Sequence, residues 1–139
     1  MPVTFHVLPH RGLLVVQASG HILLNDMVNA TARYEAHPGF DPGQKQLVDL
    51  SAVTGFEADY PRFLAMQARK AARFDARQAQ TLVVYVAPSP PAQRMATLFA
   101  RTWDSVDAVV ALVQHEPARA LALLGQPETT LAALLRPVP

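Results

Sequence analysis

Two short apolar runs separated by a long helical segment constrain the fold of this chain more than any other feature. The runs at residues 47–50 (LVDL) and 81–87 (TLVVYVA) have the length and apolar content of buried strands. Between them, residues 59–77 repeat apolar side chains at helical spacing. A strand, a helix and a strand in succession predict a right-handed crossover that joins two parallel strands.

The rest of the chain extends this alternation. We expect, in chain order, strands at 3–8 and 13–19, a helix at 25–36 capped by Asn25, the strand at 47–50, the helix at 59–77, the strand at 81–87, a helix after residue 91, a strand at 108–113 and a helix at 116–124. The first two strands are joined by residues 9–12 (PHRG) and should form an antiparallel hairpin. The predicted fold is therefore α/β, with one domain over residues 1–125 and a mostly parallel five-stranded sheet that carries the hairpin at its edge.

Residues 126–139 form a tail beyond this domain. Leu131, Leu134 and Leu135 lie at helical spacing there, but a helix of one or two turns is not stable alone. We expect the tail to lie against the body of the domain or against a second subunit. The apolar tail and the free edge of the first hairpin together predict a homodimer.

Composition excludes several classes of function. With 12 Lys and Arg against 11 Asp and Glu, the net charge of +1 gives no general attraction for nucleic acid. The absence of cysteine removes disulfides, thiolate metal sites and cysteine nucleophiles. The sequence contains neither a secretion signal nor a run of about 18 apolar residues, so we expect a cytoplasmic protein without an integral membrane segment.

No catalytic set or metal site is visible in the sequence. The histidines have no partner at i+4 and no carboxylate at ligand spacing; they are His6, His10, His21, His37 and His115. Neither a G-x-S-x-G motif nor a glycine-rich phosphate loop is present. We expect no metal, no cofactor and no enzymatic activity, unless folding brings polar residues together into a site.

The loops after the two central strands are the best candidates for a binding site. Because parallel strands end at the same edge of a sheet, residues 51–60 and 88–94 should lie over a common cleft. The N–H groups at the beginning of a helix favour anions there. The candidate residues for ligand or partner binding are Ser51, Glu57, Asp59, Tyr60, Ser89 and Arg94.

Four of these candidates also have a structural interpretation, which we favour. Ser51 suits a local hydrogen bond in a turn, and Asp59 and Ser89 suit the N-caps of the two helices. Arg94 suits a surface charge. Among the candidates, Ser89 and Arg94 form the most interesting second site, because a helix N-terminus with an arginine suits a carboxylate or a phosphate.

The helix at 59–77 has two different sides. One side, which includes Tyr60, Phe63 and Leu64, should face the core. The other carries a basic stripe formed by Arg62, Arg69, Arg73 and Arg77. The stripe either binds a phosphate-bearing ligand or an acidic protein, or it is a solvated helix face, and the second is the more frequent case.

The order of elements resembles the STAS superfamily, and within it the SpoIIAA-like branch of bacterial anti-sigma-factor antagonists. The resemblance covers about residues 3–125. It rests on residues 12–16 with Gly20, residues 38–56 including LVDLSAV at 47–53, residues 84–88 followed by 94–96, and residues 117–125. It implies a regulatory or interaction module that binds a protein partner or a small anionic ligand at the two loops.

The same resemblance implies an alternative and shows one departure. The branch is grouped with the CRAL-TRIO lipid-binding proteins, which implies a carrier of a lipid or another apolar anion, with Phe56, Tyr60, Phe63 and Met66 lining its pocket. In the antagonists, the loop after the central strand carries a serine that a kinase phosphorylates. Residues 57–60 (EADY) stand at the corresponding positions here, so this phosphoserine is absent. The acidic pair either mimics a phosphorylated state or, as we favour, leaves Asp59 as a helix cap.

Overall fold

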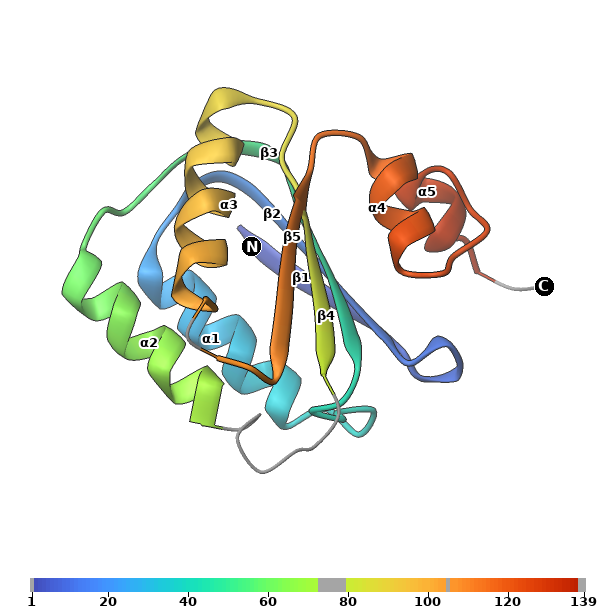
Figure 1. Ribbon diagram of the computed structural model, residues 1–139, viewed down its shortest axis with the longest axis horizontal. Coiled ribbons are helices and arrows are strands. Elements are labelled where there is room, and N and C mark those ends of the chain that lie inside the picture. Colours follow the sequence, from blue (N-terminus) through green and yellow to red (C-terminus); the bar gives the residue numbers. More distant parts are fainter. Residues whose placement is uncertain (1, 73–79, 105, 138–139) are drawn as a thin grey trace.

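The structure is a computed structural model that describes residues 2–72, 80–104 and 106–137. It confirms the predicted α/β fold, with one five-stranded sheet and helices on both of its faces (Figure 1). The strands are β1 (Val3–Leu8), β2 (Leu13–Ile22), β3 (Lys45–Phe56), β4 (Thr81–Val86) and β5 (Val109–Gln114). The helices are the 3-10 turn η1 (Pro9–Arg11), α1 (Leu24–Glu35), α2 (Tyr60–Ala72), α3 (Pro90–Thr102), α4 (Pro117–Leu123) and α5 (Leu131–Leu134).

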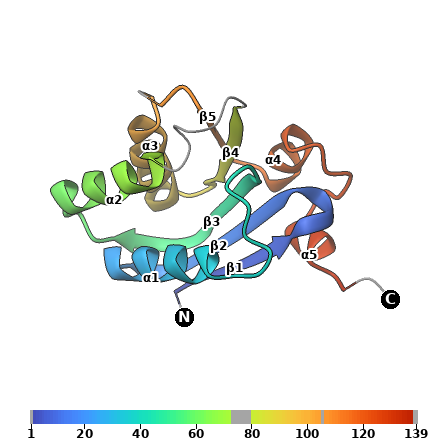
Figure 2. The same ribbon diagram turned by 90° about the horizontal axis from the view of Figure 1, so that it is seen from below.

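The strands lie in the sheet in the order in which they occur in the chain. β1 pairs with β2 in antiparallel fashion, and β2, β3, β4 and β5 are parallel neighbours. Each crossover steps one strand in the same direction, so crossovers of one hand place their helices on the same side of the sheet. Helices α1, α2 and α3 accordingly lie on one face, and α4 and α5 on the other (Figure 2). We call these the α1–α3 face and the α4–α5 face.

Strand β3 is much longer than the sequence predicted. Its first part pairs with both neighbours, but β4 accompanies it only as far as Asp49, and residues beyond that point pair with β2 alone. The expected loop from residue 51 onward is therefore wrong. Ser51, Thr54 and Gly55 favour turns locally, and pairing with the long strand β2 overrides that preference.

The two faces of the sheet bury separate hydrophobic clusters. On the α4–α5 face, the strands and helices α4 and α5 bury Leu13, Val15, Leu47, Val84, Val86, Ala120, Leu121, Leu124 and Leu134. Leu134 belongs to the tail and is 4% exposed. The tail therefore lies against the body of its own chain, the first of the two alternatives expected for it.

Two helices begin or turn differently from the prediction. The N-cap of α1 is Leu23 rather than Asn25, and the Leu23 N–H donates to the carboxylate of Asp26 at 2.9 Å. In α2, Tyr60 and Leu64 are 52% and 54% exposed, so their predicted place in the core is wrong. The helix is rotated because Phe63 packs edge-on against Phe99 of α3, with 4.9 Å between the ring centroids.

Across residues 2–72, 80–104 and 106–137, no helix combines the length and the apolar content that a membrane-spanning helix requires.

Candidate functional site

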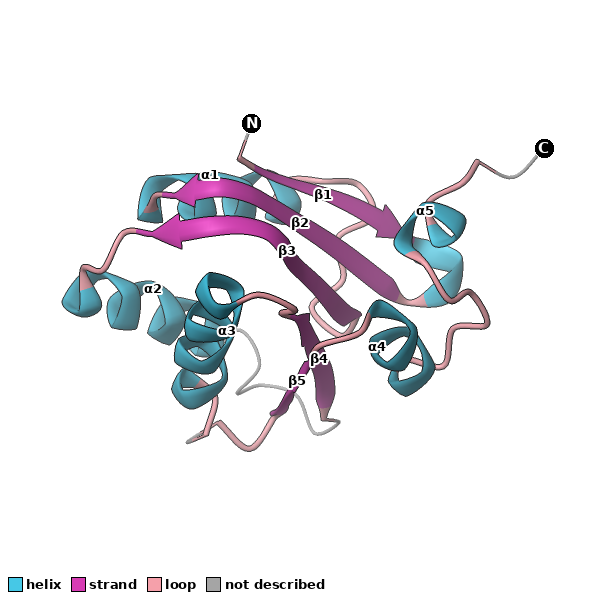
Figure 3. Cartoon of the chain, turned by 90° about the horizontal axis from the view of Figure 1, so that it is seen from above, coloured by secondary structure: helices cyan, strands magenta, loops and turns pink. Residues whose placement is uncertain are grey.

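The two predicted binding loops follow parallel neighbouring strands, but the structure does not bring them together. β4 ends opposite Asp49, whereas β3 continues through residues 50–56, which carries it roughly 20 Å farther at about 3.3 Å per residue. Helix α2 consequently begins far from the beginning of α3 (Figure 3). Neither the groove nor the cavity described below is lined by residues of both loops.

Near the end of β3, the predicted residues make local structural contacts. The Glu57 carboxylate accepts the backbone N–H of Leu24 at 2.9 Å and so caps the neighbouring helix α1. The Asp59 carboxylate accepts the N–H of Arg62 at 3.2 Å, which confirms its interpretation as the cap of α2. Earlier in the strand, the Ser51 hydroxyl donates to the carboxylate of Asp49.

The second predicted loop is similarly explained. The Ser89 hydroxyl accepts the N–H of Ala92 at 3.4 Å, which confirms Ser89 as the N-cap of α3. Arg94 is exposed on that helix, and Tyr60 is exposed at the beginning of α2. The six predicted residues therefore occupy caps, a strand and surface positions on different elements.

The basic stripe of α2 is described only in part. Arg62 and Arg69 line a groove between α1 and α2, while Arg73 and Arg77 lie outside the described residues. Arg62 donates to the side-chain oxygen of Asn25 at 3.0 Å and lies 3.6 Å from the carboxylate of Glu57. At least one member of the stripe thus joins α1, α2 and the end of β3.

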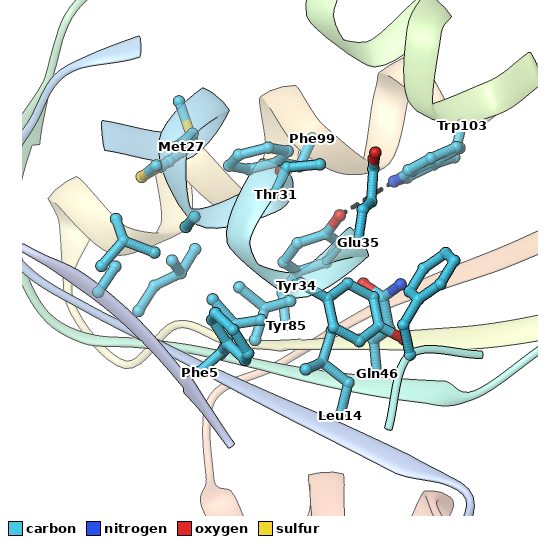
Figure 4. Close-up of a pocket in the computed structure, with 18 of the residues that line it drawn as sticks. Phe5, Leu14, Met27, Thr31, Tyr34, Glu35, Gln46, Tyr85, Phe99 and Trp103 are labelled. Atoms are coloured by element: carbon cyan, nitrogen blue, oxygen red, sulfur yellow. Dashed lines mark hydrogen bonds between the residues drawn. The ribbon is translucent and has the colours of Figure 1, made fainter. Parts of the chain in front are cut away.

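A cavity of about 120 Å³ lies between the sheet and helices α1 and α3 (Figure 4). Its wall is formed by Val3, Phe5, Leu14, Val16, Ala18, Met27, Ala30, Thr31, Tyr34, Glu35, Phe40, Pro42, Gln46, Val48, Leu50, Tyr85, Met95, Phe99 and Trp103. None of the described residues of α2 contributes to this wall. The cavity therefore occupies the space that α1 and α3 leave between them over the middle of the sheet.

One end of the cavity is formed by a buried group of three aromatic residues. Tyr85 of β4 is 3% exposed, and its ring stacks on Phe99 with 5.4 Å between the centroids. The indole N–H of Trp103 donates to the Tyr85 hydroxyl oxygen at 3.0 Å (Figure 4). Burial raises the pKa of Tyr85 far above its ordinary value, so the phenol stays neutral.

Another part of the wall is formed by Tyr34 of α1 and the residues around it. The Tyr34 hydroxyl lies 3.1 Å from the carbonyl oxygen of Asp41 and 2.5 Å from the side-chain oxygen of Gln44. Its ring meets Phe40 edge-on at 4.8 Å between centroids. Burial raises the pKa of Tyr34 to about 12, so this phenol is also neutral.

The charge and size of the cavity limit what it can hold. Among the described residues of its wall, Glu35 is the only charged one, and no Lys, Arg or His is present. Its volume is close to that of an engineered apolar cavity of about 150 Å³ that binds benzene, and below the roughly 300–1,000 Å³ of drug-sized sites. The geometry fits a small neutral molecule better than a lipid or an anion.

Sequence reasoning did not identify this cavity. It placed a possible pocket at Phe56, Tyr60, Phe63 and Met66, which do not line it. A sequence signal that could have found it is the occurrence of aromatic residues with polar tips, Tyr34, Tyr85 and Trp103, within or next to the predicted helices and strands.

The described residues contain no group of three or more His, Asp or Glu side chains that could hold a metal ion. No known family model matches this chain, and no curated protein is significantly similar to it in sequence.

Proposed function

We propose that this chain is a binding module that takes up a small, mainly apolar and uncharged molecule between its sheet and helices α1 and α3. The observation that carries the proposal is the cavity on the α1–α3 face, whose wall is apolar and aromatic with a few polar groups. Small-molecule sites commonly combine an apolar wall with a few polar groups that orient the ligand.

The proposal agrees with a sensing or regulatory module, as the resemblance to the SpoIIAA-like branch implies. It modifies the carrier alternative, since a cavity of about 120 Å³ is too small for a diacyl lipid and the described residues of its wall offer no cation to an anion. Binding without catalysis, a cytoplasmic location and STAS membership are parts of the same proposal.

Native mass spectrometry of gently purified protein provides the first test. We expect a retained small molecule, or reversible binding of benzene-sized compounds that shifts the fluorescence of Trp103. Trp103 suits this measurement because it is the only tryptophan of the sequence and lies in the cavity wall.

A pair of variants tests whether the cavity is the site. Ala30 lies in the cavity wall, while the neighbouring Asn29 is exposed on the same helix. Ala30→Leu should fill the space and weaken binding at least ten-fold, whereas Asn29→Leu should leave binding unchanged. Equal binding by both variants would place the ligand elsewhere and refute the proposal.

A protein partner is a second candidate, favoured by an exposed apolar pair on α2. Tyr60 and Leu64 lie one turn apart and are 52% and 54% exposed. If α2 contacts a partner, the double substitution Tyr60→Ser and Leu64→Ser should abolish co-purification of that partner and leave cavity binding intact.

A homodimer remains part of the proposal, with less support than the sequence suggested. The tail no longer needs a second subunit, because Leu134 is buried within its own chain. The free edge of β1 is the remaining argument. Light scattering at micromolar concentration should give twice the monomer mass, and a monomer mass would exclude this part.

A further inference from the structure

The hydroxyl group of Tyr85 can both accept and donate a hydrogen bond. Its oxygen accepts the indole N–H of Trp103, so the Tyr85 hydrogen has to point in another direction. Among the residues that the structure describes, none accepts it. A buried donor without an acceptor is unfavourable, since it has lost its bonds to water.

The surroundings of Tyr85 hold this donor in place. Its ring stacks on Phe99 at an interplanar angle of 17°, and the bond from Trp103 fixes the position of the oxygen. The residue is 3% exposed and forms part of the cavity wall, so a molecule held in the cavity can supply the acceptor. A donor fixed in this way recognises an acceptor with little loss of side-chain entropy.

The rest of the wall decides between a neutral and a charged acceptor. An anion in this cavity would be buried without a cation, because none of the described wall residues is Lys, Arg or His. Tyr34 offers no second free donor, since its hydroxyl already lies within hydrogen-bonding distance of Asp41 and Gln44. A single neutral acceptor, such as a carbonyl oxygen, satisfies Tyr85 at the smallest desolvation cost.

We infer that Tyr85 selects the ligand of the cavity by donating a hydrogen bond to a neutral molecule, about the size of one six-membered ring, that carries one acceptor such as a ketone oxygen. This inference rests on the proposed function and adds the chemical class of the ligand. Tyr85 acts in it as a specificity-determining residue, while the apolar wall supplies most of the affinity.

Three compounds of similar shape test the inference on the full chain at pH 8. Cyclohexanone has a carbonyl oxygen, methylenecyclohexane has a CH₂ group in its place, and cyclohexanecarboxylate has an anionic group. Binding is measured by the fluorescence of Trp103 and by its indole ¹H–¹⁵N signal. We expect the ketone to bind about three- to ten-fold more tightly than the alkene, the typical gain from one neutral hydrogen bond, and the carboxylate to bind most weakly.

The variant Tyr85→Phe removes the donor and keeps the ring. In it, the preference for the ketone over the alkene should disappear or invert, while the affinity for the alkene stays within about two-fold, because only the hydrogen bond is lost. Infrared spectroscopy gives a second measurement on the unaltered protein, which remains decisive if the variant does not fold. The carbonyl stretch of bound cyclohexanone should move to lower wavenumber than in an apolar solvent.

The outcomes separate this inference from the proposed function. If none of the three compounds changes the Trp103 signals, both are refuted. If ketone and alkene bind equally and the carbonyl stretch does not move, the cavity binds ligands but Tyr85 does not select them. If the carboxylate binds most tightly, the ligand class is wrong, and an anion is the better assignment.

Discussion

The two faces of the sheet share the same central strands but bury different chemistry. The cluster on the α4–α5 face consists of Leu, Val and Ala side chains, among them Leu121 and Leu124 of the region around α4. The α1–α3 face buries Tyr85, Phe99 and Trp103 together with methionines, and the cavity lies there. Aliphatic side chains interdigitate densely, whereas rings with polar tips need partners and fixed geometry. Under the function proposed above, one face stabilises the fold and the other binds the ligand.

The largest expected effect comes from the α4–α5 face. Leu121→Ala removes a side chain that is 0% exposed, and we expect it to lower the free energy of unfolding by about 2–5 kcal/mol. Leu123 lies on the same helix and is 45% exposed, so Leu123→Ala should cost less than about 1 kcal/mol. Urea denaturation of the two variants measures the difference, and equal losses would contradict a close-packed cluster on this face.

Replacing an alanine by leucine should have opposite effects on stability on the two faces of the sheet. Ala120 is 0% exposed in the aliphatic cluster, so Ala120→Leu should overpack it and destabilise the protein by about 1–3 kcal/mol. Ala30 lies in the cavity wall, so Ala30→Leu should stabilise the unliganded protein by about 0.5–2 kcal/mol. Thermal melting of both variants provides the measurement. A loss of stability in both would mean that the α1–α3 face is as densely packed as the other.

High pH should weaken the aromatic face selectively. In the unfolded chain Tyr34 ionises at about pH 10, whereas burial raises its pKa to about 12 in the folded protein. Between about pH 10 and pH 12, Tyr34 is therefore protonated in the folded protein and ionised in the unfolded chain. The stability that Tyr34 contributes is fully present below pH 10 and is lost as the pH rises toward 12. Because proton binding is linked to folding, the free energy of unfolding should fall by on the order of 2 kcal/mol over this range.

The control for this alkaline loss is Tyr34→Phe. Its stability should decline less steeply than that of the unaltered protein between pH 10 and pH 12, as followed by denaturant titration at each pH. Parallel declines would show that Tyr34 does not contribute to the alkaline loss.

The smallest effect is expected where the tail meets the first hairpin. The Arg11 guanidinium donates to the Glu128 carboxylate at 2.5 Å and holds the pKa of that carboxyl below its ordinary value. The stabilisation from this ion pair is present above the ordinary pKa of a glutamate and is lost as the pH falls through the lowered pKa of Glu128. Arg11→Gln should raise the pKa of Glu128, measured by NMR titration, with little change in melting temperature.

A matched control uses the exposed ion pair of Arg119 and Glu116, in which Arg119 Nε lies 3.8 Å from Glu116 Oε2. Arg119→Gln should leave Glu128 unaffected. A large drop in melting temperature for Arg11→Gln would show that the tail contributes more to stability than an exposed ion pair allows.

Hydrophobic periodicity was sufficient to predict the succession of strands and helices and the parallel crossovers, because both depend on the succession of buried runs. It failed at β3, where Ser51, Thr54 and Gly55 favour turns, while the pairing of residues around them with β2 keeps the chain extended. It also failed for the rotation of α2, which depends on the contact between Phe63 and Phe99. Such contacts are set by tertiary packing rather than by local pattern.

The candidate site was harder to predict than the fold. The cavity arises from the distance between α1 and α3, and its wall combines residues from strands, helices and a loop that are far apart in the sequence. Ser89 and Asp59 were attractive as binding residues because N-caps and anion sites use the same residue types. No sequence motif indicates the hydrogen bond between Trp103 and Tyr85.

The sequential strand order has a consequence for how the chain reaches its folded state. Every strand pairs with its neighbour in sequence, so sheet formation never has to close a loop longer than one crossover. A much longer loop is closed when the tail docks, because the contact between Glu128 and Arg11 joins residues that most of the chain separates. Refolding should therefore proceed outward from the hairpin and β3, and the tail should dock last and be released first on unfolding.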